Sequence, residues 1–200
     1  KEPFSVISNP EFLREGQALA DMMHPDRIVV GGDSEEAVRT VASLYEKINA
    51  PLILTDLATA EMIKYAANAF LATKISFINE VANVCEVVGA DIDMVKEGIG
   101  SDKRIGKAFL YAGLGYGGSC FPKDVRALQQ FANHKGYDFK LIKSVIEVNE
   151  QQRVLFINKL KKHLKDLKNK EILVLGLAFK ANTDDVRESA AIDIIKRLQA

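Results

Sequence analysis

The residues best suited to chemistry lie in the segment GLGYGGSCFPKD, residues 113–124, where glycines precede a cysteine, a lysine and an aspartate. Pro122 suits the first turn of a helix, because its missing N–H costs no hydrogen bond there. Cys120 is therefore predicted at or just before a helix N-terminus, where unpaired N–H groups and the helix dipole favour a thiolate. Lys123 adds positive charge, and Asp124 is near enough to order a water or act as a base. We interpret Cys120 as a reactive thiol rather than an inert cysteine under a turn.

The spacing of Gly113, Gly115 and Gly118 also matches a dinucleotide-binding loop. Such a loop follows a strand, opens a helix and is followed about 20 residues later by an acid ending the next strand. The preceding RIGKAFLYA is a poor strand, and the acid at that distance, Asp138, follows a predicted helix. We therefore favour a loop whose glycines let the backbone approach a ligand closely.

Two further pairs of polar residues have helical spacing. Lys64 and Asn68 are four residues apart in the apolar stretch EMIKYAANAFLA and share a helix face. The lysine alone could be a surface residue that extends its ammonium into water, but the asparagine one turn on favours an oxyanion or water site. Glu11 and Glu15 in NPEFLREG form the second pair, for which an ordinary acid-rich helix start is the alternative.

The remaining cysteine and the histidines are predicted to have no part in the chemistry. Cys85 lies among apolar residues in EVANVCEVVG and is expected in the core. His24, His134 and His163 have no partners at ligand spacing, so we predict no metal site.

The elements that must position these residues alternate at first between strands and helices. We expect strands over 4–8, 27–32 and 51–56, and helices over 10–23, in part, and 34–48, the latter capped by Ser34. A helical region follows, with one long helix or two nearly continuous helices over 57–89. Further helices are expected over 91–98, capped by Asp91, over 122–135 and over 139–167, with a glycine-rich loop over 100–120. A strand over 171–179 and a helix over 189–199 then begin another α/β unit. The predicted class is α/β with a large helical middle, and the predicted domains are 1–56, 57–165 and 166–200.

Composition sets broad limits on the class of protein. The chain of 200 residues is 48% hydrophobic, and its 27 basic and 27 acidic residues give a net charge of +0. This balance gives no reason to expect nucleic acid or an anionic membrane as partner. With two cysteines and no apolar run of roughly 20 residues, we predict a reduced, cytoplasmic protein without a membrane span.

Taken together, the motifs resemble the UDP-glucose 6-dehydrogenases. The matching stretches are NPEFLREG, HPDRIVVGG, EMIKYAANAFLATKISFINE, SDKRIGKAFLYAGLGYGGSCFPKD and ILVLGLAFKANTDDVRES. The resemblance runs from about residue 5 to the end. Phe121 within SCFPKD and the REG triplet look more like this branch than like the related GDP-mannose dehydrogenases.

The resemblance implies a mechanism. The family oxidises the C6 alcohol of a nucleotide sugar to a carboxylate in two hydride transfers to NAD, here from UDP-glucose to UDP-glucuronate. Cys120 would attack the C6 aldehyde to give a thiohemiacetal, and the thioester formed next would be hydrolysed. Lys64 would stabilise the oxyanion with Asn68 and a water beside it, Asp124 would position water and tune the thiol, and Glu11 would be the base for hydrolysis or act through water.

Binding roles also follow from the resemblance. The positions that would line the nucleotide-sugar site are Phe12, Leu13, Arg14, Glu15, Tyr111, Gly115, Tyr116, Gly117, Phe179 and Lys180. Arg104 matches a position that reaches the substrate of a neighbouring subunit. The positions on the cofactor side are Glu15, Lys123 and Arg187.

The resemblance also implies a domain organisation and leaves alternatives open. The chain matches the end of a Rossmann-like domain, a central long-helix domain that forms homodimers, and the start of a second Rossmann-like domain. We therefore expect a piece of a longer protein that lacks the main NAD cradle and is inactive alone. The alternatives are a dehydrogenase acting on GDP-mannose or another nucleotide sugar, and a non-catalytic helical dimerisation module.

Overall fold

The computed structural model describes residues 4–200, so residues 1–3 of the predicted first domain lie outside the described part. The chain divides into two compact units, Lys1–Ala67 and Asn68–Ala200. It combines a small sheet with extensive helix, and this confirms the predicted α/β class with a large helical middle. No helix in the part described combines the length and apolar character that crossing a membrane requires.

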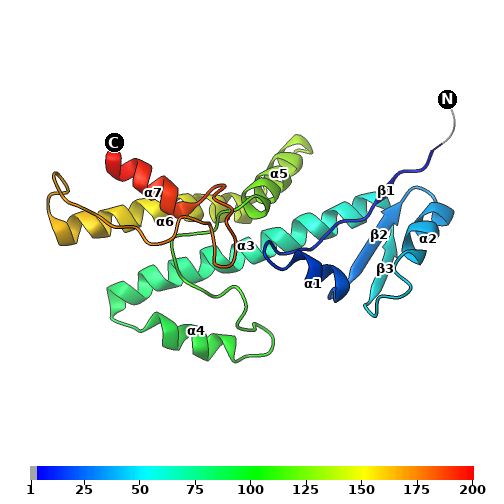
Figure 1. Ribbon diagram of the computed structural model, residues 1–200, viewed down its shortest axis with the longest axis horizontal. Coiled ribbons are helices and arrows are strands. Elements are labelled where there is room, and N and C mark those ends of the chain that lie inside the picture. The colour runs from blue at the N-terminus through cyan, green and yellow to red at the C-terminus, as the bar shows by residue number, and fades with distance from the viewer. Residues whose placement is uncertain (1–3) are drawn as a thin grey trace. The chain divides into compact units, whose positions relative to one another are not determined.

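The first unit is built on a three-stranded sheet in the order β1-β2-β3 (Figure 1). Strand β1 (Ile7–Ser8) pairs antiparallel with β2 (Ile28–Gly32), which pairs parallel with β3 (Leu52–Thr55). Apolar side chains of β2 and helix α2 (Glu35–Ser43) form its core, which includes Ile28, Val30 and Val38. The three predicted strands are thus confirmed, although β1 is short.

Helix α2 begins where the sequence offers a cap. Ser34 accepts a hydrogen bond from the Ala37 N–H at 3.3 Å, which confirms its predicted capping role for α2. Helix α1 (Ala18–Met23) covers only the second half of the predicted 10–23 segment.

Helix α3 (Leu57–Val88) is a single helix of 32 residues, as predicted from a stretch without proline or glycine. The Asp56 carboxylate accepts hydrogen bonds from the Thr59 N–H at 2.9 Å and the Thr59 hydroxyl at 2.6 Å, which satisfies the start of the helix. Gly89 follows its last residue with a φ of +72°, the left-handed conformation that ends many helices.

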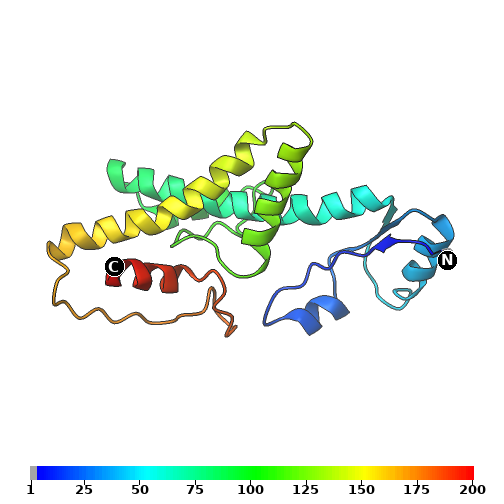
Figure 2. The same ribbon diagram turned by 90° about the horizontal axis from the view of Figure 1, so that it is seen from above.

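The second unit contains α4 (Ile92–Gly100), α5 (Cys120–His134), α6 (Lys140–Leu164) and α7 (Ala190–Gln199). Figure 2 shows α5 turning directly into α6 and α7 running beside α6, and the contacts between these helices agree. Asp91 caps α4 by accepting from the Asp93 N–H at 2.8 Å, as predicted. The core of the unit includes the fully buried Ile78, Leu110 and Val125.

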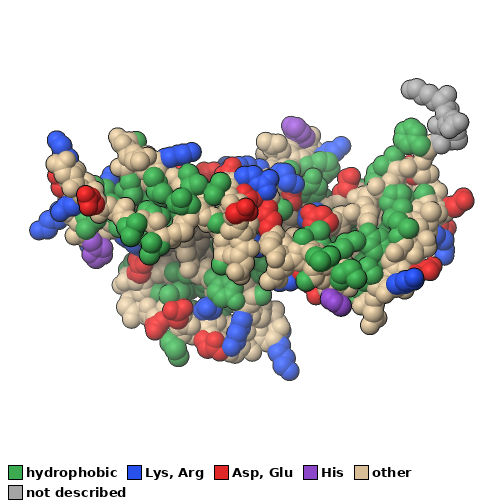
Figure 3. Space-filling model, in the orientation of Figure 1, with side chains coloured by type: hydrophobic (Ala, Val, Ile, Leu, Met, Phe, Trp, Pro, Cys, Tyr) green, Lys and Arg blue, Asp and Glu red, His purple; other side chains and the backbone are tan. Residues whose placement is uncertain are grey.

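The predicted strand over 171–179 is wrong. These residues have no regular secondary structure, because the sheet of the described chain contains only β1, β2 and β3 and offers this segment no partner. Leu173 and Leu175 are exposed as a result. Figure 3 shows hydrophobic side chains gathered on the surface around α6 and α7.

Candidate functional site

Cys120 is the first residue of α5, which confirms the predicted placement of the thiol at a helix N-terminus. Its side chain is half-buried, and its Sγ lies 3.5 Å from the Ser119 hydroxyl. Ser119 makes no side-chain cap to α5, so the thiol lies at a helix N-terminus whose first-turn N–H groups this side chain does not satisfy.

A buried carboxylate lies one helical turn after the cysteine. Asp124 is only 2% exposed, and its Oδ2 accepts from the Asn68 amide at 2.6 Å while its Oδ1 accepts from the Lys123 ammonium at 2.5 Å. Because residues four apart share a helix face, Asp124 and Cys120 lie on the same side of α5. The structure therefore brings together three predicted site residues, Asn68, Lys123 and Asp124, beside the predicted nucleophile.

Aromatic side chains enclose the start of α5. The Phe121 ring lies 6.1 Å from both the Phe109 ring and the Tyr116 ring, the latter packed edge to face. Tyr116 is buried, and this burial raises the pKa of its hydroxyl to about 12. Tyr116 was also predicted to line the nucleotide-sugar site, and this role stays a prediction.

The glycine loop before Cys120 is packed against protein atoms. A Cβ on Gly117 would lie 2.3 Å from the Glu188 carbonyl oxygen, and one on Gly118 would lie 2.7 Å from the Phe179 ring. The Gly118 N–H donates to the Arg187 carbonyl at 2.9 Å. Residues 101–119 contain no strand, so the context of a phosphate loop is absent from this part of the described chain.

Buried amide side chains of α3 and α6 hold the same loop, and the sequence analysis did not identify them. Asn79, Asn149 and Gln152 each bond its backbone. A signal was present in the sequence: the buried stripe of α6 contains Ile142, Val145, Asn149, Gln152 and Ile157, so two amides occupy apolar positions.

In the first unit, Lys64 is paired rather than extended into water. Its ammonium donates to the Glu11 carbonyl oxygen at 2.5 Å and to the Glu11 carboxylate at 3.0 Å. The other carboxylate oxygen of Glu11 accepts from the Leu13 N–H at 2.7 Å. The lysine side chain is 16% exposed, so the structure favours a held cation over the surface alternative.

The neighbours of this pair are also fixed. The Phe12 ring lies under the Arg27 guanidinium at 3.7 Å and within 5.5 Å of the Lys64 ammonium. Arg14 forms an ion pair with Asp21 at 2.5 Å, which raises the pKa of the guanidinium through hydrogen bonding and charge. Part of the Glu15 carboxylate is buried.

Other predicted residues have partners of their own. The Lys96 ammonium lies 4.6 Å from the Tyr111 ring, and Arg104 pairs with Asp102 at 2.6 Å, which raises the pKa of the guanidinium. Lys180 lies over the Phe179 ring at 5.8 Å, and Arg187 pairs with Asp185 at 2.7 Å.

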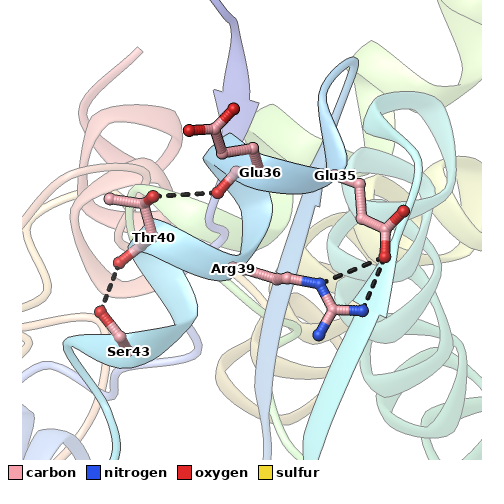
Figure 4. Close-up of a pocket in the computed structure, with 5 residues that line it drawn as sticks. All are labelled: Glu35, Glu36, Arg39, Thr40 and Ser43. Carbon is pink, nitrogen blue, oxygen red and sulfur yellow. Dashed lines mark hydrogen bonds and ion pairs between the residues drawn. The ribbon is translucent and has the colours of Figure 1, made fainter.

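The hollow on α2 contains none of the predicted site residues (Figure 4). It is lined by Glu35, Glu36, Arg39, Thr40 and Ser43. The Arg39 guanidinium pairs with Glu35 at 2.6 Å, and the two hydroxyls donate to helix carbonyls. These groups satisfy one another along an exposed helix, so the hollow does not mark the site.

The charges near the thiol fit an anionic ligand such as a dinucleotide. Lys123 and Arg187 both have exposed cationic side chains. Lys123 follows Cys120 by three residues, and the Arg187 carbonyl accepts a hydrogen bond from the Gly118 N–H of the loop that ends at Cys120. Protein atoms occupy the space next to Gly115, Gly117 and Gly118, so these glycines provide no cradle for a pyrophosphate, although Gly113 has no atom within 4 Å of an added Cβ. Such a ligand would therefore meet this part of the chain through cations.

Models of three domains of one family match the chain. The UDP-glucose/GDP-mannose dehydrogenase family matches through its NAD binding domain over residues 1–49, its central domain over 58–151 and its UDP binding domain over 173–200.

Individual relatives agree. The chain is 58% identical over 196 residues to UDP-glucose 6-dehydrogenase TuaD of Bacillus subtilis strain 168, covering 98% of this chain and 42% of TuaD. It matches the structure of a UDP-glucose dehydrogenase from Pyrobaculum islandicum with a TM-score of 0.96 and 46% identity, over 98% of this chain and 45% of that one. For a UDP-D-ManNAc dehydrogenase from Pyrococcus horikoshii the TM-score is 0.86 and the identity 28%, over 98% and 47%. The chain thus spans less than half the length of these relatives.

Proposed function

Because the chain belongs to the UDP-glucose/GDP-mannose dehydrogenase family, we propose that the full-length protein oxidises the C6 alcohol of UDP-glucose to the carboxylate of UDP-glucuronate, with NAD as the oxidant. The observation that carries the proposal is the buried Asp124 carboxylate, held by Asn68 one turn after Cys120 at the start of α5. A helix N-terminus with a thiol and a fixed carboxylate is suited to forming and hydrolysing a covalent intermediate.

Cys120 carries the covalent steps. Its thiolate adds to the carbonyl carbon of the C6 aldehyde, forming a C–S bond while the carbonyl oxygen takes a proton. Loss of a hydride from C6 together with the hydroxyl proton turns this thiohemiacetal into a thioester. Water then adds to the thioester carbonyl, the C–S bond breaks and the thiol is restored as the carboxylate leaves. Capture on the thiol keeps the aldehyde from being lost between the two oxidations.

Asp124 and Lys64 act on charge and protons. A buried, hydrogen-bonded carboxylate is able to orient the hydrolytic water, and we assign this role to Asp124. A cation with little solvent around it stabilises an oxyanion strongly, and we assign this role to Lys64. We assign to Glu11 the role of base in the hydrolysis, either directly or through a water. NAD, when bound, accepts the hydride in both oxidations, and Glu15, Lys123 and Arg187 are the residues that would hold it. The nucleotide-sugar contacts and the role of Arg104 across a subunit boundary remain predictions.

The sequence identities to the relatives favour UDP-glucose as the substrate over another nucleotide sugar. The chain shares 58% and 46% of its residues with two relatives named for UDP-glucose, but 28% with the relative named for UDP-D-ManNAc. A nucleotide-sugar dehydrogenase for a different sugar, including GDP-mannose, is the alternative within the family.

The test uses the full-length protein with UDP-glucose and NAD. We expect two NADH per UDP-glucuronate, much slower turnover of GDP-mannose, and loss of UDP-glucuronate formation in Cys120→Ala. The matched control is Cys85→Ala, because Cys85 is buried in the core and has no place in the chemistry. Full activity of Cys120→Ala, or preferred turnover of GDP-mannose, would contradict the proposal.

A homodimer through the central helices is part of the proposal. Phe70, Phe77 and Val84 are all exposed on α3 and are spaced seven residues apart, so they form one apolar stripe. A stripe of this kind is unfavourable in water and is suited to packing against a second copy.

Sedimentation of the full-length protein tests the dimer. We expect Phe77→Glu to shift it towards monomer, whereas Phe131→Glu, which changes an exposed phenylalanine on α5, leaves it unchanged. An unchanged dimer in Phe77→Glu would exclude this stripe as the interface. A non-catalytic dimerisation module would instead show no stabilisation by UDP-sugar and would tolerate Lys64→Ala.

The domain limits at residues 56 and 165, the cytoplasmic location and the inactivity of the isolated chain also stand as proposals. Inactivity is supported by the short coverage of the relatives and by the exposure of Leu173 and Leu175.

A further inference from the structure

The loop before Cys120 is held by side chains in place of regular secondary structure. The Gly113 N–H donates to the Asn79 Oδ1 at 2.7 Å, and the Gly113 carbonyl accepts from the Gln152 amide at 2.9 Å. The Tyr116 N–H donates to the Asn149 Oδ1 at 2.7 Å, and its carbonyl accepts from the Asn149 amide at 3.2 Å. Both backbone groups of two loop residues are therefore satisfied by amides from α3 and α6.

These amides are buried, and their environment fixes them in turn. Asn79 is fully buried, and Asn149 and Gln152 are less than one-tenth exposed. The Asn83 amide donates to the Gln152 Oε1 at 3.0 Å and so orients that side chain. Buried polar groups of this kind are costly when unpaired, so Asn149, Gln152 and the Oδ1 of Asn79 strongly favour the loop conformation that satisfies them, whereas the Asn79 Nδ2 has no hydrogen-bond partner among the described residues.

Gly115 is matched to the same side chains. It has a φ of +98°, and a Cβ there would lie 2.6 Å from the Asn149 Oδ1. A residue with a side chain would be strained by its backbone and would also push Asn149 away from Tyr116. Gly115 and Asn149 thus pack closely against each other at a point of the loop that lies five residues before Cys120.

We infer that Asn79, Asn149 and Gln152 form an amide clamp that positions the Cys120 thiol by fixing the backbone of residues 113–116. This inference rests on the proposed function, because it gives a positioning role for the covalent steps assigned to Cys120. None of the three side chains needs to touch the substrate. They act through the loop, whose end is the first residue of α5.

The principal test compares Asn149→Ala with Ser76→Ala in the full-length protein. Asn149→Ala removes both of this side chain's hydrogen bonds to Tyr116 and leaves the Tyr116 carbonyl only the 3.4 Å bond from the Arg153 guanidinium. Ser76→Ala removes a buried hydrogen bond between α3 and α6, from the Ser76 hydroxyl to the Val145 carbonyl at 3.0 Å, that does not touch the loop. If Asn149→Ala fails to fold, Gln152→Glu replaces it, because this variant keeps the volume and loses the donor to the Gly113 carbonyl.

Amide hydrogen exchange measures how firmly the loop is held, without any ligand. We expect exchange in the peptide over 113–119 to accelerate about 10-fold in Asn149→Ala and to stay unchanged in Ser76→Ala. In the same unliganded samples, alkylation of Cys120 by iodoacetamide, followed on its own peptide, should fall about 5-fold, because the loop no longer holds the thiol at the start of α5, where a helix N-terminus favours the thiolate. Unchanged exchange or unchanged alkylation would overturn the inference.

Kinetics then separate positioning from general destabilisation. Asn149→Ala should lower kcat about 100-fold with KM for UDP-glucose within about 3-fold, as a small misplacement of a reacting group does. Ser76→Ala should change neither. If the wild-type protein does not oxidise UDP-glucose, the proposed function fails, but the exchange and alkylation results still decide the clamp. If the wild type is active and kcat of Asn149→Ala is unchanged, the clamp is overturned and the proposed function stands.

Discussion

Two lysine–carboxylate pairs formed by predicted site residues differ in which partner is buried. In the first unit, the Lys64 side chain is 16% exposed and its partner Glu11 is 55% exposed. In the second unit the order is reversed, since Lys123 is 68% exposed and Asp124 only 2%. The two ion pairs have similar lengths, so the contrast lies in solvation.

The buried member decides what each pair offers to a ligand. A charge removed from water interacts more strongly with a nearby charge, because solvent screens it less. The Lys64 pair therefore offers a cation, which suits a developing oxyanion, and the Asp124 pair offers a carboxylate, which suits a proton or a water. A single lysine–carboxylate motif in the sequence would not distinguish these functions.

The largest expected effect is that of removing the buried carboxylate. Asp124→Ala leaves the Asn68 amide without its acceptor in the protein interior, so the free energy of unfolding should fall by about 3 kcal/mol. Denaturant unfolding of the full-length protein measures this change. Asp124→Asn is the matched control, since it keeps an acceptor for Asn68 and should lose less than half as much while hydrolysis is still impaired. Equal losses in both variants would show that the hydrogen bond to Asn68 is unimportant.

Removing the buried cation should affect activity far more than stability. Lys64→Met keeps the apolar stem of the side chain. Because Glu11 is mostly exposed to solvent, the free energy of unfolding should fall by about 1 kcal/mol or less. The loss of an oxyanion partner should lower kcat about 100-fold. Steady-state kinetics and thermal unfolding measure the two effects. Lys74→Met, on the same helix, should keep wild-type kcat; if it loses as much, Lys64 has no special role.

The sequence predicted the elements of the site well where local signals were strong. Ser34 and Asp91 cap the helices they were expected to cap, and the run without glycine or proline forms the single helix α3. The position of Cys120 followed from Pro122, because proline is favoured only in the first turn of a helix. Each of these depends on neighbours a few residues away.

Features that depend on distant partners were predicted poorly. The apolar run over 171–179 looks like a buried strand, but strand formation needs a neighbouring strand that periodicity cannot supply. The amide clamp joins residues more than thirty positions apart, between Gly113 and Asn79 and between Tyr116 and Asn149. Spacing along the chain does not report such contacts, so only the unusual amides in an apolar stripe gave a hint.

The same limit explains the contrast between the two pairs. Lys123 and Asp124 are adjacent, and Lys64 and Glu11 are fifty-three residues apart. The sequence suggested a role for each residue. The exposed fraction of each side chain, however, is set by the packing within its own unit. Burial, which assigns the functional charge, was therefore available only from the structure.

The exposed cation of the second pair should give a smaller effect. Lys123→Met leaves the buried Asp124 carboxylate with its hydrogen bond to Asn68, and the lost ammonium is itself mostly exposed, so the free energy of unfolding should fall by less than in Asp124→Ala. If the ammonium holds the cofactor, KM for NAD should rise by roughly 5-fold with kcat nearly unchanged. Kinetics with varied NAD measure this. A large loss of stability would instead mean that Lys123 matters mainly as the partner of Asp124.

The smallest effect is expected for a carboxylate held by hydrogen bonds without a cation. Asp56 precedes α3, and the hydrogen bonds from the Thr59 hydroxyl and N–H lower the pKa of its carboxyl. Its folded pKa lies below its unfolded value of about 3.9, so its contribution is complete above that pH and is lost as the pH falls through the folded pKa. Asp56→Asn should lower the melting temperature at pH 6 by roughly 2 °C, and the difference from wild type should vanish at low pH. Glu46→Gln, an exposed acid beyond α2, should show no such difference, and a gap that persists in acid would assign the effect to side-chain geometry rather than to charge.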